Sequence, residues 1–184
     1  MAQFKGTIYT SAQLFTEARF GPAALPRVLA ALPAPDRKLL TEITPIGWYP
    51  TEPVMAFHHK LDELFGNGDL AICVELGKYS AEWALNTVLK FFIRFRTPSW
   101  LLERSGSLWS RYHDSGRWEV MTSPNLQLQA RLHDFQVRDP AFCARFRGWL
   151  HRAVELTGGR DPDVREPLCL CKGEPYCEYS ARWK

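Results

Sequence analysis

The sequence predicts an α+β fold, with a helical N-terminal part of about 100 residues packed on a small antiparallel sheet crossed by one long helix. Two observations predict it. Apolar residues recur at helical spacing until about residue 117, and segment 125–133 then alternates strictly between apolar and polar residues. We expect one domain over residues 1–184, divided into a helical part (1–115) and a β-α-β-β part (116–184).

Local signals divide the N-terminal part into helices. Ser11 is suited to cap a helix that stops at Gly21, and Pro98 is suited to the first turn of another. Residues 4–9 are expected to be extended. The expected helical segments are 11–20, 22–32, 36–43, 51–65, 69–95 and one that starts at 98.

The C-terminal part changes period. Segment 125–133 predicts a half-buried strand, because its apolar residues all fall on one face. A helix is expected over 139–156. Segments 164–171 and 177–183 follow as two strands joined by a five-residue loop.

Composition narrows the class of protein. The chain has 184 residues, a net charge of +3 and no long run of Lys or Arg, so we expect no nucleic-acid partner. There is no targeting signal and no window of 18 uncharged apolar residues, so we expect no membrane partner. Five cysteines, an odd number, favour a reducing cytoplasmic location over a disulfide framework.

Cys169, Cys171 and Cys177 form the sharpest local pattern. If 164–171 is a strand, Cys169 and Cys171 share a face, and a five-residue loop places Cys171 opposite Cys177. Three thiolates suit zinc, but this spacing is not a standard zinc pattern and buried free cysteines are common. We therefore expect reduced, metal-free thiols that pack in the hairpin, with zinc as the alternative.

Aromatic residues are frequent, at 13% of the chain. A stripe of aromatic side chains on a helix either fills a core or lines a ligand cavity, and both interpretations stay open. The candidate ligand-binding residues are Tyr79, Trp83, Phe91, Phe92, Trp109 and Tyr112.

No catalytic motif is evident. The sequence has no Gly-rich phosphate loop, no nucleophile elbow and no His-Glu-x-x-His pair. His58 and His59 point about 100° apart on a helix, and the adjacent pair His113-Asp114 is weak evidence of acid–base chemistry. We therefore expect no catalytic residues and no enzymatic activity.

Four segments carry a resemblance to a known superfamily. They are residues 4–6 (Phe-Lys-Gly), 48–52 (Trp-Tyr-Pro-x-Glu), 76–79 (Leu-Gly-Lys-Tyr) and 171–179, which looks like a Cys-x-x-Gly-Asp-x-x-Cys-x-Phe ending. With them the chain resembles the superfamily of haem-nitric oxide/oxygen-binding domains and 4-vinyl-reductase-type ligand-binding domains.

Two further segments sharpen the resemblance, and two departures limit it. Residues 29–33 and 112–116 resemble a paralogous family of unknown function best known from myxobacteria. Haem-binding members carry a proximal His near residues 105–112, where this chain has Trp109, and a Tyr-x-Ser-x-Arg strand motif that segment 126–132 lacks. We therefore expect no cofactor, neither haem nor zinc.

These observations predict a non-enzymatic sensory domain. It would bind a small apolar molecule in a cavity and signal to a partner protein, because the sequence offers an apolar lining without a catalytic set. The alternative is a protein-interaction adaptor that has lost the ligand site, since Trp, Tyr and Arg are enriched at binding hot spots. Whether the chain forms a homodimer is left open.

Overall fold

The computed structural model describes residues 1–87, 97–122 and 126–184. Its architecture is α+β, as predicted. The helices are α1 (Gly6–Phe20), α2 (Ala24–Ala30), α3 (Ala34–Thr41), α4 (Thr51–Phe65), α5 (Ala71–Thr87), α7 (Pro98–Trp109) and α8 (Pro140–Leu156). The strands are β1 (Gln3–Lys5), β2 (Trp48–Pro50), β3 (Arg117–Thr122), β4 (Gln127–His133), β5 (Asp163–Leu168) and β6 (Cys177–Arg182), with a short 3-10 turn over Leu170–Lys172.

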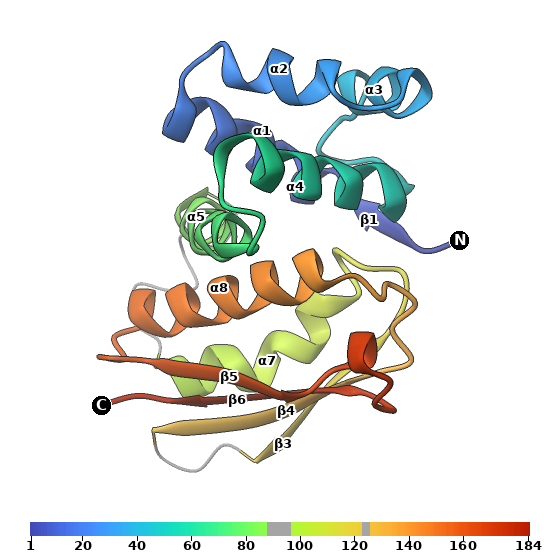
Figure 1. Ribbon diagram of the computed structural model, residues 1–184. Coiled ribbons are helices and arrows are strands. Elements are labelled where there is room, and N and C mark those ends of the chain that lie inside the picture. Colours follow the sequence, from blue (N-terminus) through green and yellow to red (C-terminus); the bar gives the residue numbers. More distant parts are fainter. Residues whose placement is uncertain (88–96, 123–125) are drawn as a thin grey trace.

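The molecule is layered (Figure 1). Helices α2 and α3 lie outermost, α1 and α4 form the next layer, and α5 lies between that layer and α8. Helix α8 and helix α7 then cover the same side of the four-stranded sheet. The main core runs through all of these layers, so the helical part and the sheet share buried residues.

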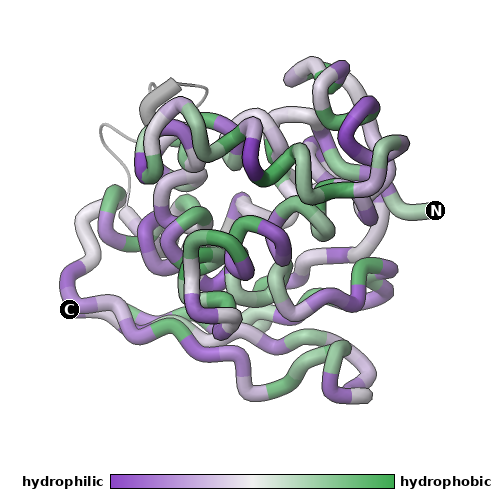
Figure 2. The backbone as a smooth tube through the Cα atoms, turned by 45° about the horizontal axis from the view of Figure 1, so that its top comes forward, coloured by the Kyte–Doolittle hydropathy of each residue, from purple (hydrophilic) through white to green (hydrophobic). Residues whose placement is uncertain are grey.

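The sheet has the order β3-β4-β6-β5, and every neighbouring pair is antiparallel. The predicted strand 125–133 is confirmed as β4, in which Leu128, Ala130 and Leu132 are buried. The tube in Figure 2 shows polar and apolar positions interspersed along these strands. Strand β3 precedes β4 and was not predicted, so the C-terminal part has the order β-β-α-β-β instead of β-α-β-β. A register shift between Val120 and Thr122 interrupts the pairing of β3 with β4.

Two helix starts lie where the sequence predicted them, at Pro98 and Pro140, whereas Ser11, expected to cap a helix, lies inside α1. The Asp139 side chain accepts a hydrogen bond from the Ala141 amide at 2.8 Å, and Pro140 opens α8. The Thr97 side chain does the same for α7, accepting from the Trp100 amide at 3.4 Å.

The extended segment expected over 4–9 is wrong beyond Lys5. Helix α1 begins at Gly6, whose amide donates to the Gly47 carbonyl at 3.0 Å. A Cβ atom at Gly6 would lie 1.9 Å from the Thr44 carbonyl oxygen, so the loop before β2 packs against the start of α1 because glycine stands there.

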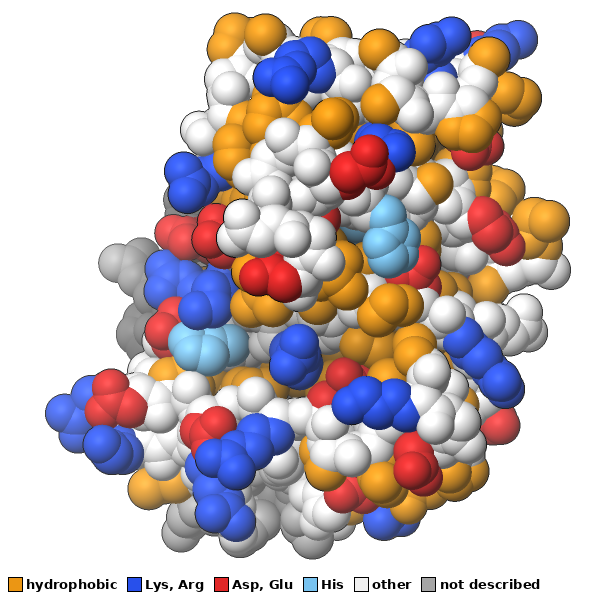
Figure 3. All heavy atoms as spheres, viewed as in Figure 1, with side chains coloured by type: hydrophobic (Ala, Val, Ile, Leu, Met, Phe, Trp, Pro, Cys, Tyr) orange, Lys and Arg blue, Asp and Glu red, His pale blue; other side chains and the backbone are white. Residues whose placement is uncertain are grey.

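Surface features agree with the modest net charge. On the face drawn in Figure 3, Lys and Arg side chains alternate with Asp and Glu, and neither sign forms a continuous field. Among the described residues, the helices are too short or too polar to cross a membrane.

Candidate ligand cavity and metal centre

A cavity of about 120 Å³ lies where α1, α5, α7, β3 and α8 meet. Its walls are mostly apolar, because each of these elements turns large side chains towards it. The aromatic residues of the lining are Trp83, Trp109, Tyr112, Trp118, Phe142, Phe146 and Trp149. Two of the indoles are fixed by hydrogen bonds from their Nε1 atoms: Trp109 donates to the Ser115 carbonyl at 2.9 Å, and Trp118 to Ser105 Oγ at 2.6 Å.

The structure brings together only some of the candidate ligand-binding residues. Trp83, Trp109 and Tyr112 line the cavity. Tyr79 does not; its ring packs against Phe15, with 5.6 Å between the centroids. Phe91 and Phe92 lie outside the described residues.

Arg145 is the charged residue of the cavity lining. It is 8% exposed and joins α8 to the first helical layers: its Nη2 atom donates to the Ile8 carbonyl at 2.9 Å, to Ser11 Oγ at 3.0 Å and to Ser80 Oγ at 3.0 Å. All three acceptors are uncharged. Burial lowers the pKa of Arg145 to about 10, which leaves it positively charged at neutral pH.

His113 is a second nitrogen-bearing polar residue of the lining, in addition to Arg145. Its ring stacks on Trp109 with 3.9 Å between the centroids, and its Nδ1 lies 3.3 Å from the Trp109 carbonyl oxygen. Burial lowers the pKa of His113 to about 3, so the ring is neutral at physiological pH.

Sequence reasoning missed Arg145 although its spacing gave a signal. It follows Phe142 by three residues and precedes Trp149 by four, so it falls on the apolar face of the helix predicted over 139–156. A charged residue inside such a stripe is a reason to look for a buried polar site. Its acceptors could not be predicted, because they come from α1 and α5.

A second site lies between α8 and the final hairpin. In the part of the chain that the structure describes, one group of side chains has metal-ligand geometry: the ligand atoms of Cys143, Glu166, Cys169 and Cys177 all lie within 4.8 Å of one another. The thiols of Cys143 and Cys169 are 3.5 Å apart. Thiolates that bind one tetrahedral zinc at about 2.3 Å lie about 3.8 Å apart, so this donor set can hold zinc.

The surroundings of the cluster also fit a cation. Glu166 Oε1 is buried and makes no hydrogen bond of good geometry with a described residue, although the Cys177 thiol and the Tyr179 hydroxyl lie near enough to interact with it. The Leu170 amide donates to Cys177 Sγ at 3.3 Å, an outer contact that holds the sulfur in place. Burial raises the pKa of Cys169 to about 12, and a bound cation would reverse that shift.

The geometry expected for the three C-terminal cysteines is wrong in part. Strand β5 ends at Leu168, which pairs with Glu178, so Cys169 and Cys171 do not share a strand face. Contrary to our expectation, Cys171 lies beyond the strand and does not stand opposite Cys177. Cys171 is exposed in the 3-10 turn, although its thiol is 3.9 Å from that of Cys143. The sequence analysis missed Cys143 and Glu166, because α8 and β5 bring them to the cluster from other parts of the chain.

The fold has known relatives. No family model matches the chain, and the search of curated proteins gave no match. Solved structures of H-NOX domains match it over nearly its whole length. An Fe(II) H-NOX protein from S. oneidensis is 14% identical with a TM-score of 0.78, covering 98% of this chain and 96% of its own. An oxygen-binding H-NOX domain related to soluble guanylate cyclases is 15% identical with a TM-score of 0.72, covering 98% and 95%.

A third structure, which concerns modulation of haem redox potential by porphyrin distortion, is 15% identical with a TM-score of 0.73, covering 98% and 95%. These likenesses show that the chain has the H-NOX fold, in agreement with the superfamily resemblance seen in the sequence. They also contradict our expectation of no cofactor, because structures that share the fold over its whole length contain iron or haem.

We tested whether the cavity fits a haem. Its donors do: His113 is a neutral imidazole, the form that ligates metals, and Arg145 is a cation that can pair with a carboxylate. Its volume does not. The cavity measures about 120 Å³, whereas pockets for drug-sized ligands span about 300–1,000 Å³. The chemistry of the donor set thus suits haem, and the room beside it suits a smaller molecule.

Proposed function

We propose that this chain is a sensory domain that binds a small, largely apolar ligand in the cavity and reports its presence to a partner protein. One observation carries the proposal: the cavity lies between two groups of elements. Helices α1 and α5 form one wall, and α7, α8 and β3 form the other. A ligand there contacts both walls at once. Occupancy can therefore change how the two walls pack, which is what a sensor needs.

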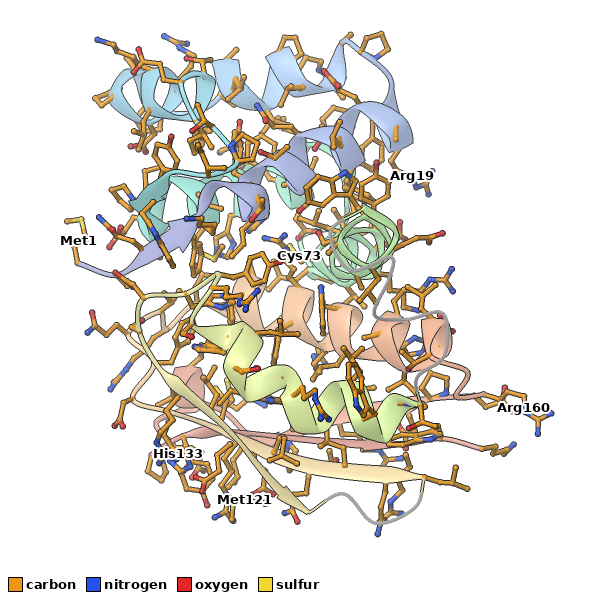
Figure 4. The ribbon with its side chains drawn as sticks, turned by 180° about the vertical axis from the view of Figure 1, so that it is seen from behind. Met1, Arg19, Cys73, Met121, His133 and Arg160 are labelled. Carbon is orange, nitrogen blue, oxygen red and sulfur yellow. The ribbon has the colours of Figure 1, made fainter. Side chains whose placement is uncertain are left out.

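The residues around the cavity favour binding over catalysis. A general base works best when its pKa is near the working pH, and that of His113 is far below it. The buried thiol of Cys73, in the interior beside α8 (Figure 4), has a pKa that burial raises to about 12, so it is a poor nucleophile. An adaptor without a ligand site remains the alternative, and it would need no cavity.

Haem is a second candidate ligand, favoured by the H-NOX fold and by His113. In that case the His113 imidazole would hold the iron, which would supply the capacity to bind a diatomic gas, and the cavity of about 120 Å³ would have to widen to admit the porphyrin. Arg145 would provide the positive charge for a propionate.

We further propose that Cys143, Glu166, Cys169 and Cys177 bind one zinc ion in a structural role. A closed set of four protein ligands is typical of structural zinc sites. This ion would fasten α8 to the β5–β6 hairpin and thereby fix one wall of the cavity.

Other features of the proposal rest on the sequence. We propose that residues 1–184 act as one cytoplasmic domain, with a signalling protein or a second copy of the chain as the partner. Its closer relation to the myxobacterial paralogous family is likewise a proposal, based on residues 29–33 and 112–116.

The test combines ligand detection with a blocked cavity. Native mass spectrometry and a visible absorption spectrum of freshly purified protein would report a retained organic molecule or a haem. Toluene binding would then be measured by calorimetry for the wild type and for Ala84→Phe, which fills the cavity from α5. Ala71→Phe, at an exposed position of the same helix, is the matched control. We expect binding in the wild type and control only; equal binding by Ala84→Phe would contradict the proposal.

A further inference from the structure

Arg145 has a buried positive charge, and no described carboxylate stands beside it. In the described parts of the chain no Asp or Glu forms an ion pair with it. Cys73 lies near enough to act on it, but that thiol has a pKa of about 12 and is uncharged at neutral pH. A buried charge is normally paired, because removing it from water is costly unless an opposite charge compensates.

The hydrogen bonds of Arg145 leave room for such a partner. Those with described residues all originate from Nη2, which donates to Ile8, Ser11 and Ser80. Nε and Nη1 donate to no described protein acceptor, and Arg145 is part of the cavity lining. Nη2 alone fixes the guanidinium between α1 and α5, and this leaves the other two nitrogens for a molecule in the cavity.

We propose that the ligand of this cavity carries a carboxylate and that Arg145 binds it. The inference rests on the proposed ligand-binding function and specifies its substrate class. A guanidinium is suited to a carboxylate, because two of its N–H groups can donate to the two oxygens in parallel. The positive charge of Arg145 would then be neutralised only when the ligand is bound.

The remaining walls define the rest of the ligand. Most of the apolar lining consists of Trp and Phe rings, which favour a flat apolar body. The polar lining residues besides Arg145 are Thr7, Ser11, Ser80, Ser105, Tyr112 and His113. A cavity of about 150 Å³ lined by apolar side chains holds benzene, so the somewhat smaller volume of 120 Å³ found here limits the apolar body of the ligand to about one ring. The ligand class is therefore a small aromatic or similarly compact carboxylic acid.

The test compares a charged probe with a neutral probe of the same shape. Benzoate and benzamide differ mainly in charge, and both can be titrated into the full chain by calorimetry. We expect benzoate to bind the wild type at least about tenfold more tightly than benzamide, as a charge-assisted hydrogen-bonded pair implies. Arg145→Met should remove this preference while benzamide binding persists, and Arg145→Lys should retain part of it.

Each other outcome overturns the inference in a recognisable way. If benzamide or toluene binds and benzoate binds no better, the carboxylate proposal fails and the ligand-binding function stands. If none of the probes binds the wild type, both fail. A benzoate preference that survives in Arg145→Met would place the anion elsewhere. Should Arg145→Met fail to fold, the test rests on the affinities of the wild type and of Arg145→Lys for benzoate and benzamide.

The source of the carboxylate can be read from the purified protein. A Soret band with one haem per chain would assign it to a haem propionate. A retained acid in native mass spectra, without a Soret band, would assign it to a free carboxylic acid.

Discussion

Gly148 of α8 packs directly on the backbone of Val74 in α5: a Cβ atom at Gly148 would lie 2.0 Å from the Val74 carbonyl oxygen. The reciprocal contact is as close, since a Cβ at Gly77 would lie 1.9 Å from the carbonyl oxygen of Arg145. The two helices therefore cross at a distance that only glycine permits, and this crossing places Arg145 beside Ser11 and Ser80.

We predict that Gly148→Ala destabilises the protein. The new methyl group meets backbone rather than a movable side chain, so the helices must separate, at a cost of about 1–3 kcal/mol in unfolding free energy. Urea unfolding measures it. Glu75→Ala, at an exposed position of α5, is the control and should change stability little. A Gly148→Ala protein as stable as the wild type would show that the crossing can relax.

The thiol cluster predicts one zinc ion per chain in protein purified without chelator. Cys143→Ser should lose the zinc and lower the melting temperature, because metal binding contributes directly to folding. Cys73→Ser, which alters a buried thiol outside the cluster, should keep the zinc. Mass spectrometry measures the zinc content per chain. Protein that stays zinc-free after reconstitution would refute the assignment of a zinc site to the thiol cluster.

Two histidines, the buried His58 and the half-buried His113, predict that stability falls in mild acid. Burial lowers the pKa of His58 well below its usual value and that of His113 to about 3, whereas both have a pKa of about 6.5 when unfolded. The unfolded chain therefore binds more protons between these values. The two histidines contribute fully to the free energy of unfolding above about pH 6.5. As the pH falls below that value, each histidine lowers the free energy of unfolding by about 1.4 kcal/mol per pH unit.

His58→Phe isolates one of these contributions. Both His58 ring nitrogens are buried without a partner among the described residues, so Phe removes an unfavourable burial as well as the titrating group. Urea unfolding at pH 7.0 and 5.5 should show a smaller loss of stability in the variant. At pH 8 and above, neither histidine should contribute a slope. An unchanged loss between pH 7.0 and 5.5 would contradict the assignment.

The cap of α8 gives a fourth prediction. Asp139 accepts from the Ala141 amide, and His59 Nε2 lies 2.8 Å from its Oδ1. Asp139→Ala should cost about 1 kcal/mol of unfolding free energy, because it leaves a helix N-terminal amide without an acceptor. Asp139→Asn keeps a capping oxygen and should retain most of the stability, measured by thermal unfolding. Equal losses in both variants would assign the effect to the contact with His59 instead.

Much of the fold could be predicted because its signals are local. The strict alternation after Asn125 specified β4, since side chains on a strand point to opposite faces. Asp139-Pro140 specified the start of α8. The final hairpin was predicted too, but not its 3-10 turn: residues 169–171 alternate like a strand, whereas in the structure Cys169 and Cys177 lie together with Cys143 in the thiol cluster.

The two sites were decided by tertiary structure. The sequence alone gave six aromatic candidates, of which Trp83, Trp109 and Tyr112 line the cavity. It also gave Cys169, Cys171 and Cys177 as neighbouring thiols. Only the folded chain brings Arg145 to Ser11, 134 residues away, and Cys143 to Cys169, 26 residues away. Periodicity shows which face of an element is buried. Which buried faces meet depends on the helix crossing and the strand order, because contacts between distant segments are set by packing of the whole core.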